Sequence, residues 1–144
     1  MKKNVLITGT VMNSDTESIS VYNDLISLID KEKYNICSPL DTMIFSGTDV
    51  EKYQRAMLLL ENADVVIAEV SSASTGQGME LQQAAVLEIP VLAIAKTNSK
   101  VSGLIKGCQN IRNIIYYDNV LEIGDSVNSF ITEAAKGKNS INRK

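Results

Sequence analysis

Five short apolar segments alternate along the chain with segments whose apolar residues recur at helical spacing. The clearest of the five, DVVIAEV at residues 64–70, is almost continuously apolar, which is typical of a strand buried on both faces of a parallel sheet. Neighbouring parallel strands need a crossover, usually a right-handed one through a helix. The alternation therefore predicts an α/β fold with a doubly wound, five-stranded parallel sheet of order 2-1-3-4-5 between two helical layers. The predicted strands are residues 4–9, 33–38, 64–70, 90–95 and 113–117.

The segments between these strands carry helix signals. In residues 14–32, apolar side chains such as Tyr22 and Ile26 recur three or four positions apart, and Ser14 or Asp15 is suited to cap the start. Further helices are predicted at 48–63, 79–88, 101–108 and 120–136, the last interrupted or started near Gly124.

In a sheet of this order the direction of the crossovers reverses between strands 1 and 3. Ligands bind at that point, outside the carboxyl ends of the strands. Three loops meet there: residues 9–13, 69–78 and 96–103. We therefore expect any functional site in the crevice that these loops surround.

Length and charge bound the rest. The 144 residues make one domain, which we place at 1–135, followed by a basic flexible tail at 136–144. Four of the 14 basic residues lie in that tail, which leaves 10 basic against 17 acidic side chains in the body. Such an acidic body favours no nucleic acid polymer as partner. No apolar run is long enough to span a membrane, and we expect a cytoplasmic protein in which Cys37 and Cys108 are reduced thiols.

The chain contains no histidine. This excludes catalytic Ser-His-Asp and Cys-His groups and most zinc sites, so we expect no metal and no cofactor. The glycine motifs of P-loops and of dinucleotide-binding folds are also missing, which disfavours ATP hydrolysis and nicotinamide chemistry. Any chemistry here must use carboxylates, hydroxyls, lysine, thiols or backbone dipoles.

The loop after the third strand reads EVSSASTGQGME and leads into a helix. Its glycines permit close approach of a ligand, and the free N–H groups of a helix start attract anions, although an ordinary strand-to-helix turn explains the same residues. Glu80 follows at the start of that helix. It either complements the helix dipole or is an ionised nucleophile whose pKa the dipole lowers.

Residues 61–95, ENADVVIAEVSSASTGQGMELQQAAVLEIPVLAIA, resemble the signature of the nucleoside 2-deoxyribosyltransferase family. The shared features are an Ala-Asp pair that opens an apolar strand, a Ser/Gly loop, Gly-x-Glu, and an alanine-containing helix leading to a Pro-Val strand. Within that family the chain is most similar to the short 2′-deoxynucleoside 5′-monophosphate N-glycosidases. Their strand-glycine-hydroxyl opening is matched by ITGT at 7–10, and a later serine segment by VSGLIKG at 101–107.

The resemblance implies a flavodoxin-like, Rossmann-like fold and a homodimer or higher homo-oligomer that cleaves the bond between a base and C1′ of a sugar. Glu80 matches the nucleophile of the family. The other matched positions are Ser74, Gly76 and Gly78 in the loop that holds the 5′-phosphate, Ser102 reaching the phosphate from a neighbouring subunit, and Gly9 and Thr10 in the sugar-phosphate loop.

Three supporting positions differ from the family pattern. The second catalytic carboxylate falls on Ala56, a strand tyrosine falls on Leu6, and an arginine of the hydrolase branch falls on Met12. Asp49 and Tyr53 precede Ala56 by about two turns and one turn on one helix face, so they are candidate substitutes, although an N-cap and a packing residue are the simpler interpretations.

Two further carboxylates flank the third strand. Asp64, at its start, we interpret as structural. Glu69, near its carboxyl end, either faces the site as acid/base support or pairs with a basic neighbour such as Lys96.

Three functional hypotheses remain. The first is an N-glycosidase acting on (deoxy)nucleoside 5′-monophosphates through Glu80, by chemistry that resembles that of retaining glycosidases. The second is a nucleoside 2-deoxyribosyltransferase that exchanges bases between deoxynucleosides. The third is a nucleotide-binding or sensing domain with impaired catalysis, favoured by Ala56 and Leu6.

Overall fold

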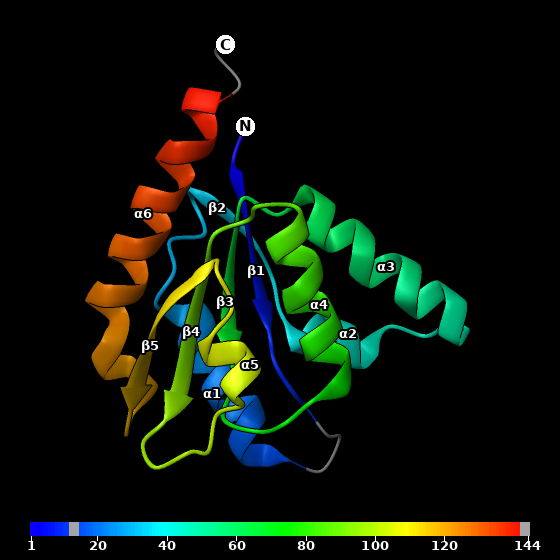
Figure 1. Cartoon of the computed structure of the whole chain (residues 1–144), viewed down its shortest axis with the longest axis horizontal. Helices are drawn as coiled ribbons and strands as arrows, with labels where there is room; N and C mark the ends of the chain where they lie inside the picture. The colour runs from blue at the N-terminus through cyan, green and yellow to red at the C-terminus, as the bar shows by residue number, and fades with distance from the viewer. Residues whose placement is uncertain (12–14, 142–144) are drawn as a thin grey trace.

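All five predicted strands form, and they pair into one parallel sheet in the predicted order, β2-β1-β3-β4-β5 (Figure 1). This is a computed structural model, and it describes residues 1–11 and 15–141. The strands are β1 (Lys3–Thr8), β2 (Tyr34–Cys37), β3 (Val65–Glu69), β4 (Val91–Lys96) and β5 (Ile111–Tyr117). The central strand β3 is buried along its whole length, as its apolar sequence predicts.

The helices are α1 (Thr16–Ser27), α2 (Pro39–Ile44), α3 (Asp49–Asn62), α4 (Thr75–Val86), α5 (Gly103–Lys106), the 3-10 turn η1 (Val120–Ile123) and α6 (Gly124–Ile141). Asp15 caps α1 as expected, and α6 starts at Gly124. None of the helices in the described ranges is long and apolar enough to cross a membrane.

The helix boundaries depart from the sequence prediction in several places. Helix α1 ends at Ser27 rather than at residue 32, and α5 covers only the middle of the predicted segment 101–108. The short helix α2 was not predicted: Pro39 occupies its first turn, and Ser38 and Asp41 form a capping box. Helix α4 begins at Thr75 rather than at residue 79, so Gly76 and Gly78 lie inside the helix. Helix α6 continues to Ile141, well into the segment expected to be a flexible tail from residue 136.

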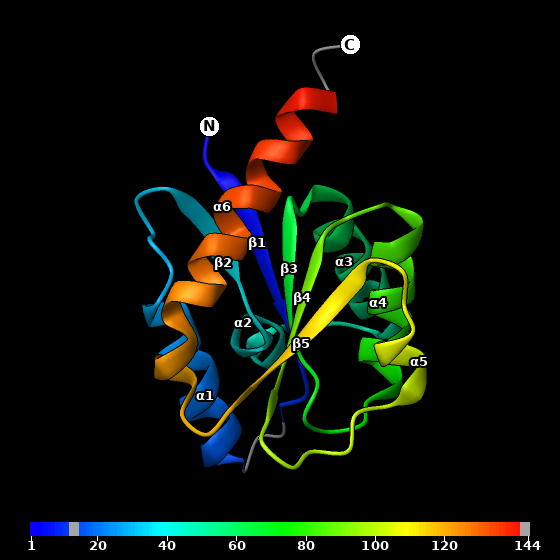
Figure 2. The same ribbon diagram turned by 60° about the vertical axis from the view of Figure 1, so that its left-hand side comes forward.

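The two faces of the sheet carry separate cores. Helices α1 and α6 pack on one face, where Val5, Ile7, Ile67 and Ile94 are buried. Helices α3, α4 and α5 pack on the other, in a cluster that includes the buried Val66. Figure 2 shows the sheet nearly edge-on between these two layers. The alternation of side chains along a strand therefore decides which layer each residue of the carboxyl edge faces.

Candidate active site

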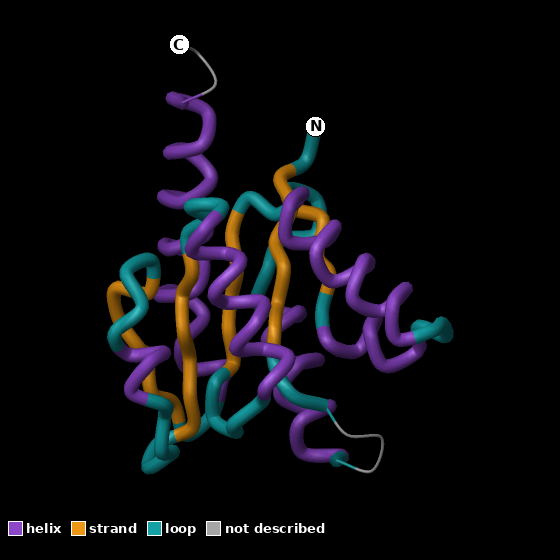
Figure 3. Tube along the Cα trace, turned by 45° about the vertical axis from the view of Figure 1, so that its right-hand side comes forward, coloured by secondary structure: helices purple, strands orange, loops and turns teal. Residues whose placement is uncertain are grey.

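Helix α4 starts at the carboxyl ends of β1 and β3, where a buried glutamine fixes its first turn. The side chain of Gln77 is 3% exposed, and its Nε2 donates to Thr8 Oγ1 at 3.2 Å and to the backbone oxygen of Glu69 at 2.9 Å. Ser74 caps the helix, because its Oγ accepts a hydrogen bond from the backbone N–H of Gln77 at 3.2 Å. Figure 3 shows α4 lying beside α3 over this face of the sheet.

This first turn contains two glycines that no contact within the chain explains. A Cβ added to Gly76 or to Gly78 meets nothing within 4 Å, and no described glycine has a positive φ. Glycine within a helix is less favourable than alanine by about 1 kcal/mol. Neither packing nor backbone conformation requires these glycines, and they leave open space above the start of α4.

Glu80 lies about one turn beyond Gln77 on the same helix. Its side chain is half-buried, and its carboxylate makes no hydrogen bond or ion pair with any described residue. Burial raises the pKa of the Glu80 carboxyl above its ordinary value. The predicted lowering of this pKa by the helix dipole is wrong: because α4 begins at Thr75, Glu80 lies past the first turn, where the dipole acts most strongly.

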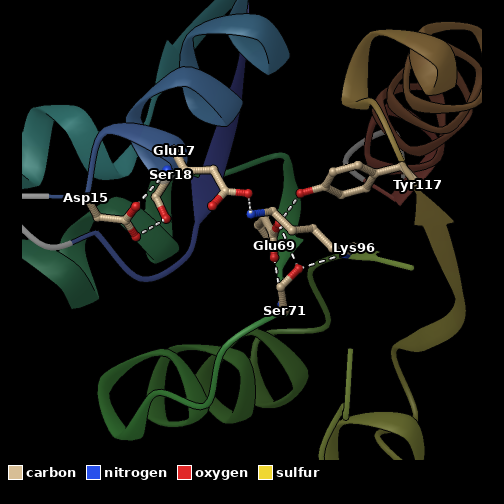
Figure 4. Close-up of polar contacts among 7 residues, drawn as sticks. All are labelled: Asp15, Glu17, Ser18, Glu69, Ser71, Lys96 and Tyr117. Carbon is tan, nitrogen blue, oxygen red and sulfur yellow. Dashed lines mark hydrogen bonds and ion pairs between the residues drawn. The ribbon is translucent and has the colours of Figure 1, made fainter. Parts of the chain in front are cut away.

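Glu69 lies on the opposite face of the sheet from α4. Its side chain points to the same face of β3 as those of Val65 and Ile67, which belong to the core under α1 and α6. Glu69 is 7% exposed, and its carboxylate accepts from the backbone N–H of Ser71 at 2.6 Å, from Ser71 Oγ at 3.1 Å and from the hydroxyl of Tyr117 (Figure 4). The carboxylate of Glu69 is thus held on the α1 side of the sheet, whereas Glu80 lies on α4 over the other face.

The predicted pairing of Glu69 with Lys96 does not occur. Lys96 Nζ reaches across the crevice to Glu17 Oε1 of α1 at 2.5 Å, while the backbone N–H of Lys96 donates to Ser71 Oγ at 2.7 Å. Burial, followed by the hydrogen bond to Glu69, raises the pKa of Tyr117, so this tyrosine remains a donor near neutral pH. The carboxylate of Glu69 is satisfied by neutral donors, which leaves Lys96 free to pair at the surface.

The loop after β1 borders a small pocket on this α1 side. A Cβ at Gly9 would lie 2.1 Å from the hydroxyl oxygen of Tyr22, and that hydroxyl donates to the backbone oxygen of Thr10 at 2.7 Å. Gly9 is therefore required by internal packing. Thr10 Oγ1 is buried without a hydrogen-bond partner in the described structure. The pocket is lined by Thr10, Ser18, Val21, Tyr22, Glu69, Ser71, Ser72 and Lys96.

Asp49 and Tyr53 do not support Glu80 by any hydrogen bond or ion pair. Asp49 is the first residue of α3 and is exposed, with a carboxylate oxygen 3.9 Å from Lys52 Nζ; Thr48, not Asp49, is the N-cap. Tyr53 is 54% exposed, so it is not the packing residue that we expected as the simpler interpretation. Both residues lie on the surface of α3.

The remaining predicted residues lie where their strands and loops place them. Ser102 is exposed and caps α5, its Oγ accepting from the N–H of Leu104 at 3.3 Å. Asp64 is structural, as predicted, because its carboxylate accepts from the backbone N–H of Asn4 at 2.7 Å. Cys37 lies in β2 and is half-buried, and Cys108, also half-buried, donates to Asn110 Oδ1 at 2.9 Å.

The structure thus brings Ser74, Gly76, Gly78 and Glu80 together in the first two turns of α4. Sequence reasoning missed Gln77, which fixes this unit to the sheet. A signal was present, because Gln77, Leu81 and Ala84 share the buried face of α4, and a polar residue on such a face must find partners.

Comparisons with known proteins identify the family of the chain. No family model matches the chain. The 5-hydroxymethyl-dUMP N-hydrolase of Branchiostoma floridae is 31% identical over 75 residues, which cover 51% of this chain and 71% of that protein. The chain belongs to the nucleoside 2-deoxyribosyltransferase family.

Further relatives lie in the same branch of the family. A Methanosarcina mazei protein whose name places it among the 2′-deoxynucleoside 5′-phosphate N-hydrolases is 29% identical over 112 residues, covering 74% of this chain and 69% of that protein. The matches to three more relatives with this name span between 38% and 52% of their lengths.

Solved structures of the family share the fold. The CMP N-glycosidase BcmB of Clostridium botulinum superposes with a TM-score of 0.69 at 15% identity, covering 88% of this chain and 98% of that one. The 2-deoxyribosyltransferase of Bacillus psychrosaccharolyticus superposes with a TM-score of 0.64 at 13% identity, covering 84% and 90%. At these identities the likeness concerns the fold alone.

The positions that depart from the family pattern fall in different settings. Ala56 is half-buried on α3, and Leu6 is buried in the core of β1. Met12 lies outside the described residues. At Ala56 and Leu6 the chain has apolar side chains in place of the family's polar groups.

Proposed function

We propose that the chain is an N-glycosidase that hydrolyses the bond between base and sugar in (deoxy)nucleoside 5′-monophosphates, with Glu80 as nucleophile. The observation that carries the proposal is the combination in α4 of a half-buried carboxylate without a partner and two glycines without an internal reason. Residues that folding does not require are explained by a ligand above the helix start. The names of the relatives support a nucleotide as that ligand.

The chemistry suits a single carboxylate. Cleavage of the C1′–N bond leaves its electron pair on the base and positive charge on C1′, which Glu80 would stabilise or trap as a covalent ester. Water then attacks C1′, and the C1′–O bond to Glu80 breaks with its electron pair returning to the carboxylate. The proton that the water loses balances the proton that the departing base gains, so the products are the sugar phosphate and the free base. A raised pKa fits a nucleophile whose carboxylate is poorly hydrated and therefore reactive.

The start of α4 would hold the phosphate. The first N–H groups of a helix have no partner within the helix, and the helix dipole favours an anion there. The hydroxyl of Ser74 and the exposed backbone at Gly76 would complete this cradle, while Gly78, whose N–H donates to the backbone oxygen of Ser74 at 3.1 Å, would leave room for the phosphate. One phosphate can be bound in this way by a protein whose net charge is −3.

A second copy of the chain would complete the site. Ser102 is exposed at the start of α5, and the family resemblance assigns the matching serine to the phosphate of a neighbouring subunit. We therefore propose a homodimer or higher homo-oligomer. We also propose that the protein acts in the cytoplasm, where it would meet free nucleotides. Dilution to a monomer should then weaken binding of the monophosphate.

One experiment tests the proposal. The protein is incubated with ribo- and deoxyribonucleosides and their 5′-monophosphates, with and without a second free base, and released base is followed by chromatography. Glu80→Gln is the inactive variant, and Glu61→Gln, an exposed glutamate on α3, is the matched control. Base release from monophosphates alone, lost in Glu80→Gln and kept in Glu61→Gln, supports the hydrolase.

Other outcomes would favour the alternatives. Exchange that needs a second base and accepts unphosphorylated nucleosides would indicate a deoxyribosyltransferase. Turnover of no substrate, with a nucleotide still raising the melting temperature, would indicate a binding or sensing domain and overturn the enzyme.

A further inference from the structure

We propose that Gln77 is a positioning residue for Glu80: its side-chain amide fixes the first turn of α4 to β1 and β3 and thereby sets where the carboxylate stands at the carboxyl edge of the sheet. The inference rests on the proposed function, in which Glu80 is the nucleophile. Gln77 would act through the helix and would not touch the substrate.

Both ends of this connection are rigid. Thr8, which accepts at 3.2 Å, is 3% exposed at the end of β1. The backbone oxygen of Glu69, which accepts at 2.9 Å, belongs to the fully buried central strand. With both of its acceptors in the sheet, the amide holds the helix start in one place relative to the strands.

The first turn of α4 needs such a connection. Two of its first four residues are Gly76 and Gly78, each less favourable in a helix than alanine by about 1 kcal/mol. Within the chain, the cap from Ser74 and the amide of Gln77 are the side-chain hydrogen bonds that oppose fraying of this turn in the described structure. Glycines that leave room for a ligand thus create a weakness that the buried amide offsets.

A loss of this connection would change the position of Glu80. It begins the next turn, and no described side chain holds its carboxylate by a hydrogen bond or ion pair. Its position is therefore set by the backbone of α4. Because burial is the only cause that raises its pKa, with no charged group contributing, a displaced or frayed helix start would hydrate the carboxylate and lower that pKa.

Three variants test the inference. Gln77→Leu removes both hydrogen bonds at similar volume, and Thr8→Val removes one of them with little change of shape. Gln82→Leu is the matched control, because Gln82 is exposed on the same helix and its side chain makes no hydrogen bond to a described residue. For each, the titration of the Glu80 side-chain carboxyl is followed by ¹³C NMR, and kcat and KM are measured on the monophosphate that the wild type cleaves.

Gln77→Leu should move the titration midpoint of Glu80 to lower pH and reduce kcat by roughly 10- to 100-fold, the cost of a misplaced reacting group, and KM should rise as well, because the same turn is proposed to hold the phosphate. Thr8→Val should move both the midpoint and kcat in the same direction by less, and Gln82→Leu should move neither. The effects of Gln77→Leu and Thr8→Val should not add in the double variant, because both remove the hydrogen bond between Gln77 and Thr8.

A folded Gln77→Leu with the wild-type Glu80 titration and kcat would overturn the inference, whether or not KM rises. If Gln77→Leu does not fold, Thr8→Val decides on the same terms. If the wild type cleaves nothing, the proposed function fails, and the NMR titration still decides whether Gln77 positions Glu80.

Discussion

At the carboxyl edge of the sheet, the two sides differ in how far contacts within the chain explain the residues found there. On the α1 side, Gly9 is required by the hydroxyl of Tyr22, and Glu69 accepts three hydrogen bonds from Ser71 and Tyr117. On the α4 side, the glycines contact nothing and Glu80 has no described partner. Folding explains these residues of the first side, where the buried hydroxyl of Thr10 is the exception, whereas the second side is explained only by something that the chain does not contain.

This difference separates residues that share a chemical type. Glu69 and Glu80 are both carboxylates close to the same crevice, and a sequence pattern treats them alike. A buried carboxylate with three donors is a structural group, and removing it should cost stability. A half-buried carboxylate with no donor weakens the fold and persists when function requires it.

Glu80→Gln should give the largest effect and the clearest separation of activity from stability. Base release should fall by at least about 10³-fold, as when a covalent nucleophile is removed. The raised pKa of Glu80 means that the ionised carboxylate destabilises the folded state, so the stability linked to its protonation is present at low pH and lost as pH rises through the folded pKa. At pH 7 the variant should therefore melt at a higher temperature than the wild type, a gain that disappears near pH 4, as calorimetry would measure.

Glu69→Gln should show the reverse pattern. Replacing a buried carboxylate that accepts three hydrogen bonds should lower the free energy of unfolding by about 2–3 kcal/mol, while kcat per folded molecule stays within about threefold of the wild type. Urea denaturation measures the free energy of unfolding, and titration of the active molecules allows kcat to be expressed per folded molecule. A folded variant that is as inactive as Glu80→Gln would contradict the division between the two sides.

Substitutions of the glycines test the same comparison between the two sides and should give smaller effects. Gly76→Ala and Gly78→Ala should raise the free energy of unfolding by about 0.5–1 kcal/mol and raise KM for the monophosphate roughly tenfold, or about 1.4 kcal/mol of binding. Gly9→Ala should instead destabilise the fold by about 1–3 kcal/mol, because its Cβ would lie 2.1 Å from the Tyr22 hydroxyl.

Gly137→Ala is the control for helix stability alone, because a Cβ there meets nothing within 4 Å and Gly137 lies near the end of α6. It should stabilise without changing KM. An unchanged KM in both α4 variants would leave their glycines without a function.

The sheet could be predicted from the sequence because its signals are local: each apolar run lies between helical segments, and parallel pairing fixes the topology. The site could be predicted only in part. The glycines of α4 are weak helix formers, so the pattern indicated a loop and placed the helix start too late, which in turn reversed the expected pKa shift of Glu80. One partner of Glu69, Tyr117, and one of Gln77, Thr8, come from strands distant in sequence, and no local pattern specifies which distant group a buried side chain will reach.

The smallest expected effect concerns how pH changes the ionisation of two carboxylates, those of Asp15 and Glu80. Hydrogen bonds from Ser18 lower the pKa of the exposed Asp15, whereas burial raises that of Glu80. Since Glu80 must be ionised to attack, kcat/KM should fall as pH drops, with a midpoint above the ordinary range of glutamate. Because desolvation rather than a neighbouring charge causes the shift, raising the salt concentration from 0.05 to about 0.5 M should leave that midpoint in place. A midpoint that moves with salt would mean that a charged group, rather than burial alone, controls Glu80, and the α4 side would then contain a partner for it after all.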